Sequence, residues 1–137
     1  MTEALFGGLV GAVIASFITA WLQNLINIKN EKRHALREYY AVLSQWHTAH
    51  LENQYQKYKE ISQKESDTFG RSAYLLKMNI VENIVRYKVL LYSYQHINEG
   101  KTVVYKRSKE EVLSETFNEI EEIFHEIHTY FERCLNK

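Results

Sequence analysis

The chain has 137 residues, of which 45% are hydrophobic and 25% are charged, which excludes a disordered or low-complexity protein and allows one small domain. Seventeen basic side chains balance seventeen acidic ones, so no overall field attracts nucleic acid, and we expect no binding of duplex nucleic acid. The single cysteine, Cys134, excludes an internal disulfide framework. With no proline and five glycines, the composition favours long helices and predicts an all-α fold.

The N-terminal residues predict a transmembrane helix. From Ala4 to Ile28 the sequence has no charged side chain, and a helix needs roughly 20 apolar residues to cross about 30 Å of hydrocarbon. A cleaved signal peptide is the main alternative, but Glu3 takes the place of its basic residues and no small-x-small cleavage site follows. We therefore divide the chain into a transmembrane helix, residues 1–28, and a cytoplasmic helical domain, residues 29–137.

Basic residues follow this span directly. The excess comprises Lys29, Lys32, Arg33 and Arg37. Because positively charged flanks stay on the cytoplasmic side, the sequence predicts a single pass with the N-terminus outside and the C-terminal domain inside.

Small residues recur in pairs every four positions of the span and therefore share one helix face, while bulky residues take the opposite face. This small-residue face consists of Gly7, Gly8, Gly11, Ala12, Ala15, Ser16, Thr19 and Ala20. In lipid such a face lets helix backbones approach closely, and we predict that it joins the chains into a symmetric homo-oligomer. The alternative is that glycine and alanine are simply common in membrane spans.

No proline or glycine interrupts the sequence from Lys29 to Ser62, which predicts that the membrane helix continues as a stalk, followed by a loop from Gln63 to Gly70. A second helix is expected over Arg71 to Asn98, with Gly100 as its C-terminal stop. That helix is apolar over much of its circumference, which predicts a central place in the bundle or burial by a neighbouring subunit.

The segment from Lys101 to Arg107 is β-prone and is expected to be either a short strand or a basic loop. Ser108 with Glu111 matches a capping box, so the last helix should begin at Ser108 and continue to the C-terminus. Its eight glutamates contrast with the basic segment before it, which indicates charge complementarity within or between subunits.

The candidate ligand site is a basic cluster around Tyr105. It consists of Lys101, Lys106 and Arg107, joined by Arg86, Lys88 and Asn83 from the second helix. Lysine and arginine bind phosphate oxygens by charge-assisted hydrogen bonds and tyrosine can stack on a base, so a nucleotide or oligonucleotide would fit. The alternative is a solvated loop whose charges only keep this edge soluble.

Two histidine pairs and a Glu-x-x-His spacing were considered as metal ligands. These are His47 with His50, His125 with His128, and Glu122 with His125. A helical di-metal site needs a second Glu-x-x-His motif and two further inward glutamates, so we expect no metal and assign these histidines to the core or an interface. The sequence contains no phosphate-binding glycine loop or nucleophile elbow, and we expect neither a cofactor nor enzymatic activity.

One small-residue-rich span, a basic flank and a compact helical domain resemble, as an architecture, the small membrane effectors of bacterial antiphage defence, most of all those of type III CRISPR systems. The resemblance implies a protein of the bacterial inner membrane whose soluble domain binds cyclic oligoadenylate and whose spans then perturb the bilayer. It assigns Lys101, Tyr105, Lys106 and Arg107 to the second-messenger site. The alternatives are a non-enzymatic membrane-tethered scaffold or regulator of a protein partner, and a phage-encoded exclusion or lysis protein.

Overall fold

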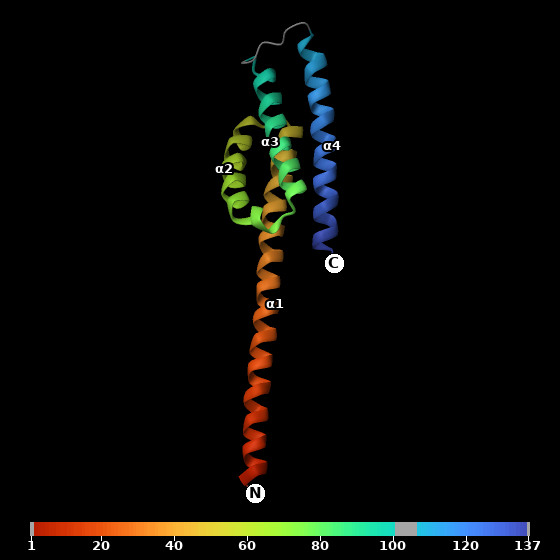
Figure 1. The fold of residues 1–137 in the computed structure, drawn as a ribbon. Helices are drawn as coiled ribbons and strands as arrows, with labels where there is room; N and C mark the ends of the chain where they lie inside the picture. The colour runs from red at the N-terminus through yellow and green to blue at the C-terminus, as the bar shows by residue number, and fades with distance from the viewer. Residues whose placement is uncertain (1, 101–106, 137) are drawn as a thin grey trace. The chain divides into compact units, whose positions relative to one another are not determined.

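A computed structural model of the chain describes residues 2–100 and 107–136, and every regular element in that part of the chain is helical (Figure 1). This confirms the predicted all-α fold. The chain divides into two compact units between Ala35 and Leu36. The elements in chain order are α1 (Thr2–Leu51), α2 (Tyr55–Ser72), the short 3-10 helix η1 (Ala73–Leu75), α3 (Met78–Asn98) and α4 (Lys109–Leu135).

The first unit is the N-terminal part of α1. It contains a stretch long and apolar enough to cross a membrane, and none of that stretch is buried inside the protein. A core helix of a soluble protein would be covered by its neighbours, whereas this stretch is not covered by any other described element. The large side chains that it exposes are Leu9, Val10, Val13, Ile14, Phe17, Ile18, Trp21, Leu22, Leu25, Ile26 and Ile28.

The second unit is a helical bundle that contains the end of α1 together with α2, η1, α3 and α4. Helices α3 and α4 lie side by side along most of their length (Figure 1). All four α-helices contribute to one buried core, in which the residues recur at helical spacing. The core consists of Tyr39, Leu43, Trp46, Tyr58, Ile80, Ile84, Tyr87, Leu91, Ile120, Ile123, Ile127 and Phe131.

A capping motif ends α1 at Leu51, before the predicted end of the stalk at Ser62. Asn53 has a positive φ of 54°, its N–H donates to the His50 carbonyl at 3.3 Å, and the Gln54 N–H donates to the Ala49 carbonyl at 3.0 Å. These two bonds form a Schellman motif with asparagine in the left-handed position usually taken by glycine. The prediction of one helix through Ser62 was therefore wrong, because asparagine turned the chain without glycine or proline.

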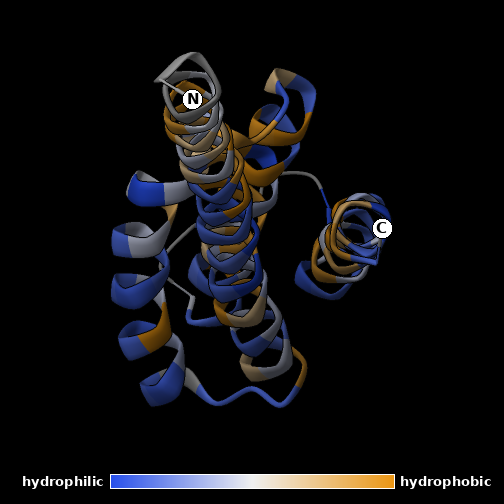
Figure 2. Ribbon diagram, turned by 90° about the horizontal axis from the view of Figure 1, so that it is seen from below, coloured by the Kyte–Doolittle hydropathy of each residue, from blue (hydrophilic) through white to orange (hydrophobic). Residues whose placement is uncertain are grey.

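The predicted loop from Gln63 to Gly70 was also wrong, because these residues lie within α2. This helix is mostly hydrophilic (Figure 2), and it inserts polar side chains into the bundle. Glu65 and Thr68 are buried to 1% and 3% exposure. Since polar residues hold core positions of α2, its hydropathy pattern did not indicate a helix.

The second predicted helix begins later than expected. The chain from Ala73 passes through η1 and an extended Lys77 before α3 starts, whereas the predicted end is confirmed by Gly100, whose φ is 74°. Val85 and Val89 on α3 are 47% and 58% exposed, so the described chain covers only about half of each side chain.

Helix α4 begins as the sequence predicts. The Ser108 hydroxyl accepts a hydrogen bond from the Glu111 N–H at 3.2 Å, which satisfies one of the free donors in the first turn. The strand or loop predicted from Lys101 to Arg107 lies outside the described residues except for Arg107, which is not in a regular element.

Candidate functional site

A cluster of polar contacts in the bundle core joins three helices through His47 of α1. Its Nδ1 atom lies 2.8 Å from the Tyr87 hydroxyl of α3, and its Nε2 atom lies 2.9 Å from Oε1 of Glu121 on α4. The ring also stacks on Phe124, with 3.7 Å between centroids. The partners fit one neutral tautomer, in which Nε2–H faces the carboxylate and the Tyr87 hydroxyl donates to Nδ1.

Burial sets the charge state of this network. It lowers the pKa of His47 to about 4, and it raises the pKa of Tyr87 well above its usual value. The Tyr87 side chain is fully buried, so a substrate cannot reach its hydroxyl in this arrangement. The network therefore positions three helices against one another rather than presenting a reactive group to solvent.

His50 lies one helical turn beyond His47 and has a different environment. Its ring packs against Tyr94 of α3 and Phe117 of α4, with centroid distances of 4.9 and 5.6 Å. The Nε2 atom is buried without a hydrogen-bond partner among the described residues. Burial, reinforced by the neighbouring His47, lowers the pKa of His50 to about 4, while Glu121 opposes the shift.

A buried ion pair attaches α2 to the bundle. Oε1 of Glu65 accepts a hydrogen bond from the Tyr39 hydroxyl at 2.8 Å and lies 2.7 Å from the Lys88 ammonium. That ammonium also lies 3.8 Å from the centroid of the Phe69 ring, a cation–π contact. Removing one partner of such a pair leaves an uncompensated buried charge, so this contact fixes the position of α2.

The histidines considered as metal ligands are separated by the fold. His47 and His50 belong to the core as expected, His125 is exposed, and His128 contacts the Tyr40 hydroxyl through Nδ1. In the part of the chain that the structure describes, no three His, Cys, Asp or Glu side chains are grouped to hold a metal. Cys134 is half-buried near the end of α4.

Four residues of the predicted anion site lie within the described ranges, namely Arg107, Arg86, Lys88 and Asn83, whereas Lys101, Tyr105 and Lys106 lie outside them. Lys88 is held in the ion pair with Glu65, and the Asn83 amide donates to Glu126 at 3.2 Å. The Arg107 guanidinium makes a two-pronged salt bridge to Glu115 in the second turn of α4, which raises the pKa of Arg107 and lowers that of Glu115. Arg86 is exposed in the middle of α3.

Helix geometry separates these two arginines. The Lys109 ammonium binds the Asn98 carbonyl at 3.1 Å, so the start of α4 lies at the C-terminal end of α3. Arg86 and Asn98 are twelve helical steps apart on α3, roughly 18 Å along a helix. In the described chain Arg107 therefore lies at one end of the α3–α4 pair and Arg86 lies well along it.

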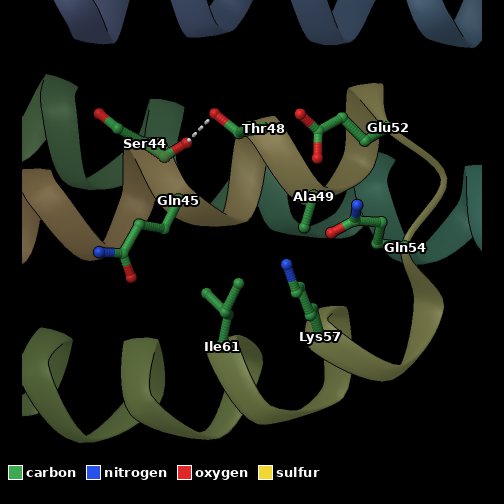
Figure 3. A pocket seen from close by; sticks show the side chains of 8 residues that line it. All are labelled: Ser44, Gln45, Thr48, Ala49, Glu52, Gln54, Lys57 and Ile61. Atoms are coloured by element: carbon green, nitrogen blue, oxygen red, sulfur yellow. Dashed lines mark hydrogen bonds between the residues drawn. The ribbon is translucent and has the colours of Figure 1, made fainter.

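A groove between α1 and α2 was not indicated by the sequence. Figure 3 shows Ile61 and Lys57 of α2 pointing toward Gln45 and Ala49 of α1. The space that they border has a volume of about 410 Å³. Polar amides and hydroxyls line it together with one ammonium and one carboxylate. The full lining is Ser44, Gln45, Thr48, Ala49, Glu52, Gln54, Lys57 and Ile61.

The sequence missed this groove because the stalk prediction placed all of these residues on one straight helix. The turn at Asn53 instead folds α2 back along α1, which brings residues 44–49 opposite residues 57–61. The buried Glu65 was missed because the sequence placed it in a predicted loop, from Gln63 to Gly70.

No family model, curated protein or solved structure matches this chain.

The first prediction concerns acid sensitivity. The folded pKa values of His47 and His50 lie near 4 rather than 6.5, so between these pH values the unfolded chain binds more protons than the folded chain. The free energy of unfolding should therefore fall with falling pH, by up to about 1.4 kcal/mol per pH unit for each histidine. His50→Phe should reduce this pH dependence of the free energy of unfolding by the contribution of one histidine. Denaturant unfolding of the bundle across this pH range measures the change. His125→Gln, at an exposed position, is the control, and an unchanged slope in His50→Phe would refute the assignment.

Proposed function

We propose that the protein is a single-pass membrane protein, with its N-terminus outside and its helical bundle in the cytoplasm, and that it acts by binding rather than by catalysis. The uncharged apolar stretch of α1, in which no residue from Gly7 to Ile28 is buried, carries this proposal, because water is an unfavourable environment for so large a continuous apolar surface. The four basic residues from Lys29 to Arg37 support the orientation.

Cysteine labelling tests the orientation. In a Cys134→Ser background, Thr2→Cys should react with a membrane-impermeant maleimide in intact cells, because the N-terminus is expected outside. Lys64→Cys, at an exposed position of α2, should react only after lysis. The opposite labelling pattern would contradict the proposed topology.

We further propose that the spans associate through the small-residue face. A Cβ atom placed at Gly7, Gly8 or Gly11 would meet nothing within 4 Å, so no packing inside the described chain explains these glycines. The Thr19 hydroxyl donates to the Ala15 carbonyl at 2.8 Å, which satisfies its donor within the helix and leaves its oxygen able to accept from a neighbouring span.

Bulky substitutions test this association. Gly11→Leu and Ala15→Leu would each separate backbones in contact and should shift the protein from oligomer to monomer in detergent and in lipid. Val13→Leu, on the bulky side, is the matched control and should leave the assembly unchanged. Analytical ultracentrifugation and energy transfer between labelled chains measure the change, and equal assembly of all three variants would contradict the proposed face.

The finer proposal is that the bundle senses an anionic second messenger, such as a cyclic oligoadenylate, and changes the packing of the spans. In a symmetric oligomer, each subunit would contribute its Lys101–Arg107 segment around the symmetry axis. A single anionic ligand on that axis would then form charge-assisted contacts with several subunits at once. The Arg107–Glu115 salt bridge bears on this directly, since a phosphate would have to replace the Glu115 carboxylate. Such an exchange couples ligand binding to the first turns of α4.

Ligand binding is tested with the full chain in lipid nanodiscs. A cyclic oligoadenylate at 100 times its Kd should stabilise the fold by about 2.7 kcal/mol. Lys106→Glu with Arg107→Glu should abolish this gain, and Glu115→Gln should strengthen binding because it frees Arg107. Glu119→Gln, at an exposed position one turn further along α4, should have no effect. If no cyclic nucleotide changes the unfolding temperature, the tethered scaffold becomes the better interpretation.

A further inference from the structure

The connection between α2 and α3 exposes the two most accessible large apolar side chains of the bundle. Tyr74 is 77% exposed and Met78 is 72% exposed, more than any other large apolar side chain described between Leu36 and Asn136. Exposed basic residues flank both of them, Arg71 at the end of α2 and Lys77 at the start of α3. We name these four residues, Arg71, Tyr74, Lys77 and Met78, the connection patch.

The connection patch lies at the end of the bundle where α1 enters it. Helix α2 runs antiparallel to the last turns of α1, because the Tyr39 ring lies 5.6 Å from Phe69 and the Trp46 ring lies 5.5 Å from Tyr58. The C-terminal end of α2 is therefore level with Leu36, the first residue of the bundle. Figure 1 shows α2 running back along the end of α1 that belongs to the bundle.

The sequence limits how far this end can lie from the membrane span. Only seven residues separate Ile28, the last residue of the uncharged stretch, from Leu36. Eight helical steps cover about 12 Å, and even a fully extended tether covers about 28 Å. The Leu36 end of the bundle therefore stays close to the headgroup layer whatever its orientation.

We propose that the connection patch is a second membrane contact, in which Tyr74 and Met78 enter the headgroup layer and Arg71 and Lys77 bind anionic headgroups. This inference rests on the proposed membrane anchoring. Tyrosine is enriched at membrane interfaces because its ring is apolar and its hydroxyl is wet, and basic side chains near an anionic leaflet gain electrostatic attraction. The long basic side chains can also lay their stems along the apolar residues while their charges remain at the phosphates.

A lipid surface fits the patch better than a protein partner does. Four side chains on one short connection present too small an area for a stable protein–protein interface on their own, whereas a membrane held nearby by the tether needs no such area. Docking at this point would hold one end of the bundle against the leaflet. Any ligand that favours the undocked state would then release the bundle, because the two states differ in their lipid contacts.

The experiment places a nitroxide label beside the patch without altering it. Gly70 is suitable because a Cβ atom there meets nothing within 4 Å, and Gly70→Cys is made in a Cys134→Ser full-length chain. The control label is Leu51→Cys, an apolar position that is 48% exposed at the opposite end of α1 in the bundle. Both proteins are reconstituted into phosphatidylcholine vesicles with and without phosphatidylserine, and collisions with a water-soluble nickel complex are compared with collisions with oxygen.

The Gly70 label should be shielded from nickel several-fold more than the Leu51 label, and the shielding should increase with phosphatidylserine. Arg71→Glu with Lys77→Glu should remove this increase. The matched control is a charge reversal at the other end of α2, Lys57→Glu with Lys59→Glu. It reverses two exposed positive charges and should leave the phosphatidylserine-dependent increase in shielding unchanged.

The remaining outcomes separate this inference from the proposed function. A protein that does not float with vesicles would refute the membrane anchoring itself. A protein that floats while both labels remain equally accessible to nickel would overturn the second contact alone. Shielding that does not change with phosphatidylserine but rises with the protein-to-lipid ratio would show that a second copy of the protein covers the patch. That result would also overturn the second membrane contact.

Discussion

The apolar surface of α1 that the chain leaves uncovered is the constraint from which the other features follow. From Gly7 to Ile28 every large apolar side chain is exposed, and lipid or other such helices would remove this surface from water. In the proposed membrane anchoring, the basic residues from Lys29 to Arg37 lie at the membrane boundary. The short tether to Leu36 would then bring the side chains exposed at that end of the bundle near the headgroups.

The bundle itself is fixed by polar groups at positions where apolar residues would be expected. Glu65 holds α2 through Tyr39 and Lys88, and His47 joins α1 to α3 and α4. Buried groups of this kind contribute little net stability, but breaking one contact is costly because its partner stays buried. They favour one arrangement of the helices over others of similar hydrophobic burial.

The candidate ligand, membrane and subunit contacts lie on different parts of the chain. The small-residue face belongs to the span, the connection patch to one end of the bundle, and the Arg107–Glu115 salt bridge to the other end, where α4 begins. A signal between these sites would have to pass along α3 and α4, which pack together closely. A two-state change of such a pair requires only that each ligand prefer one of the two packings.

The sequence by itself determined the features that depend on local chemistry. The length of the uncharged N-terminal stretch predicted the apolar helix, Ser108 predicted the start of α4, and Gly100 predicted the end of α3. These features are set by a few neighbouring residues along the chain. Only the tertiary structure decided where α1 ends, that residues 63–70 are helical, and which polar side chains are buried. Asn53 adopts the left-handed conformation, and Glu65 is buried only because Lys88 and Tyr39 meet it from other helices, a condition that no local pattern contains.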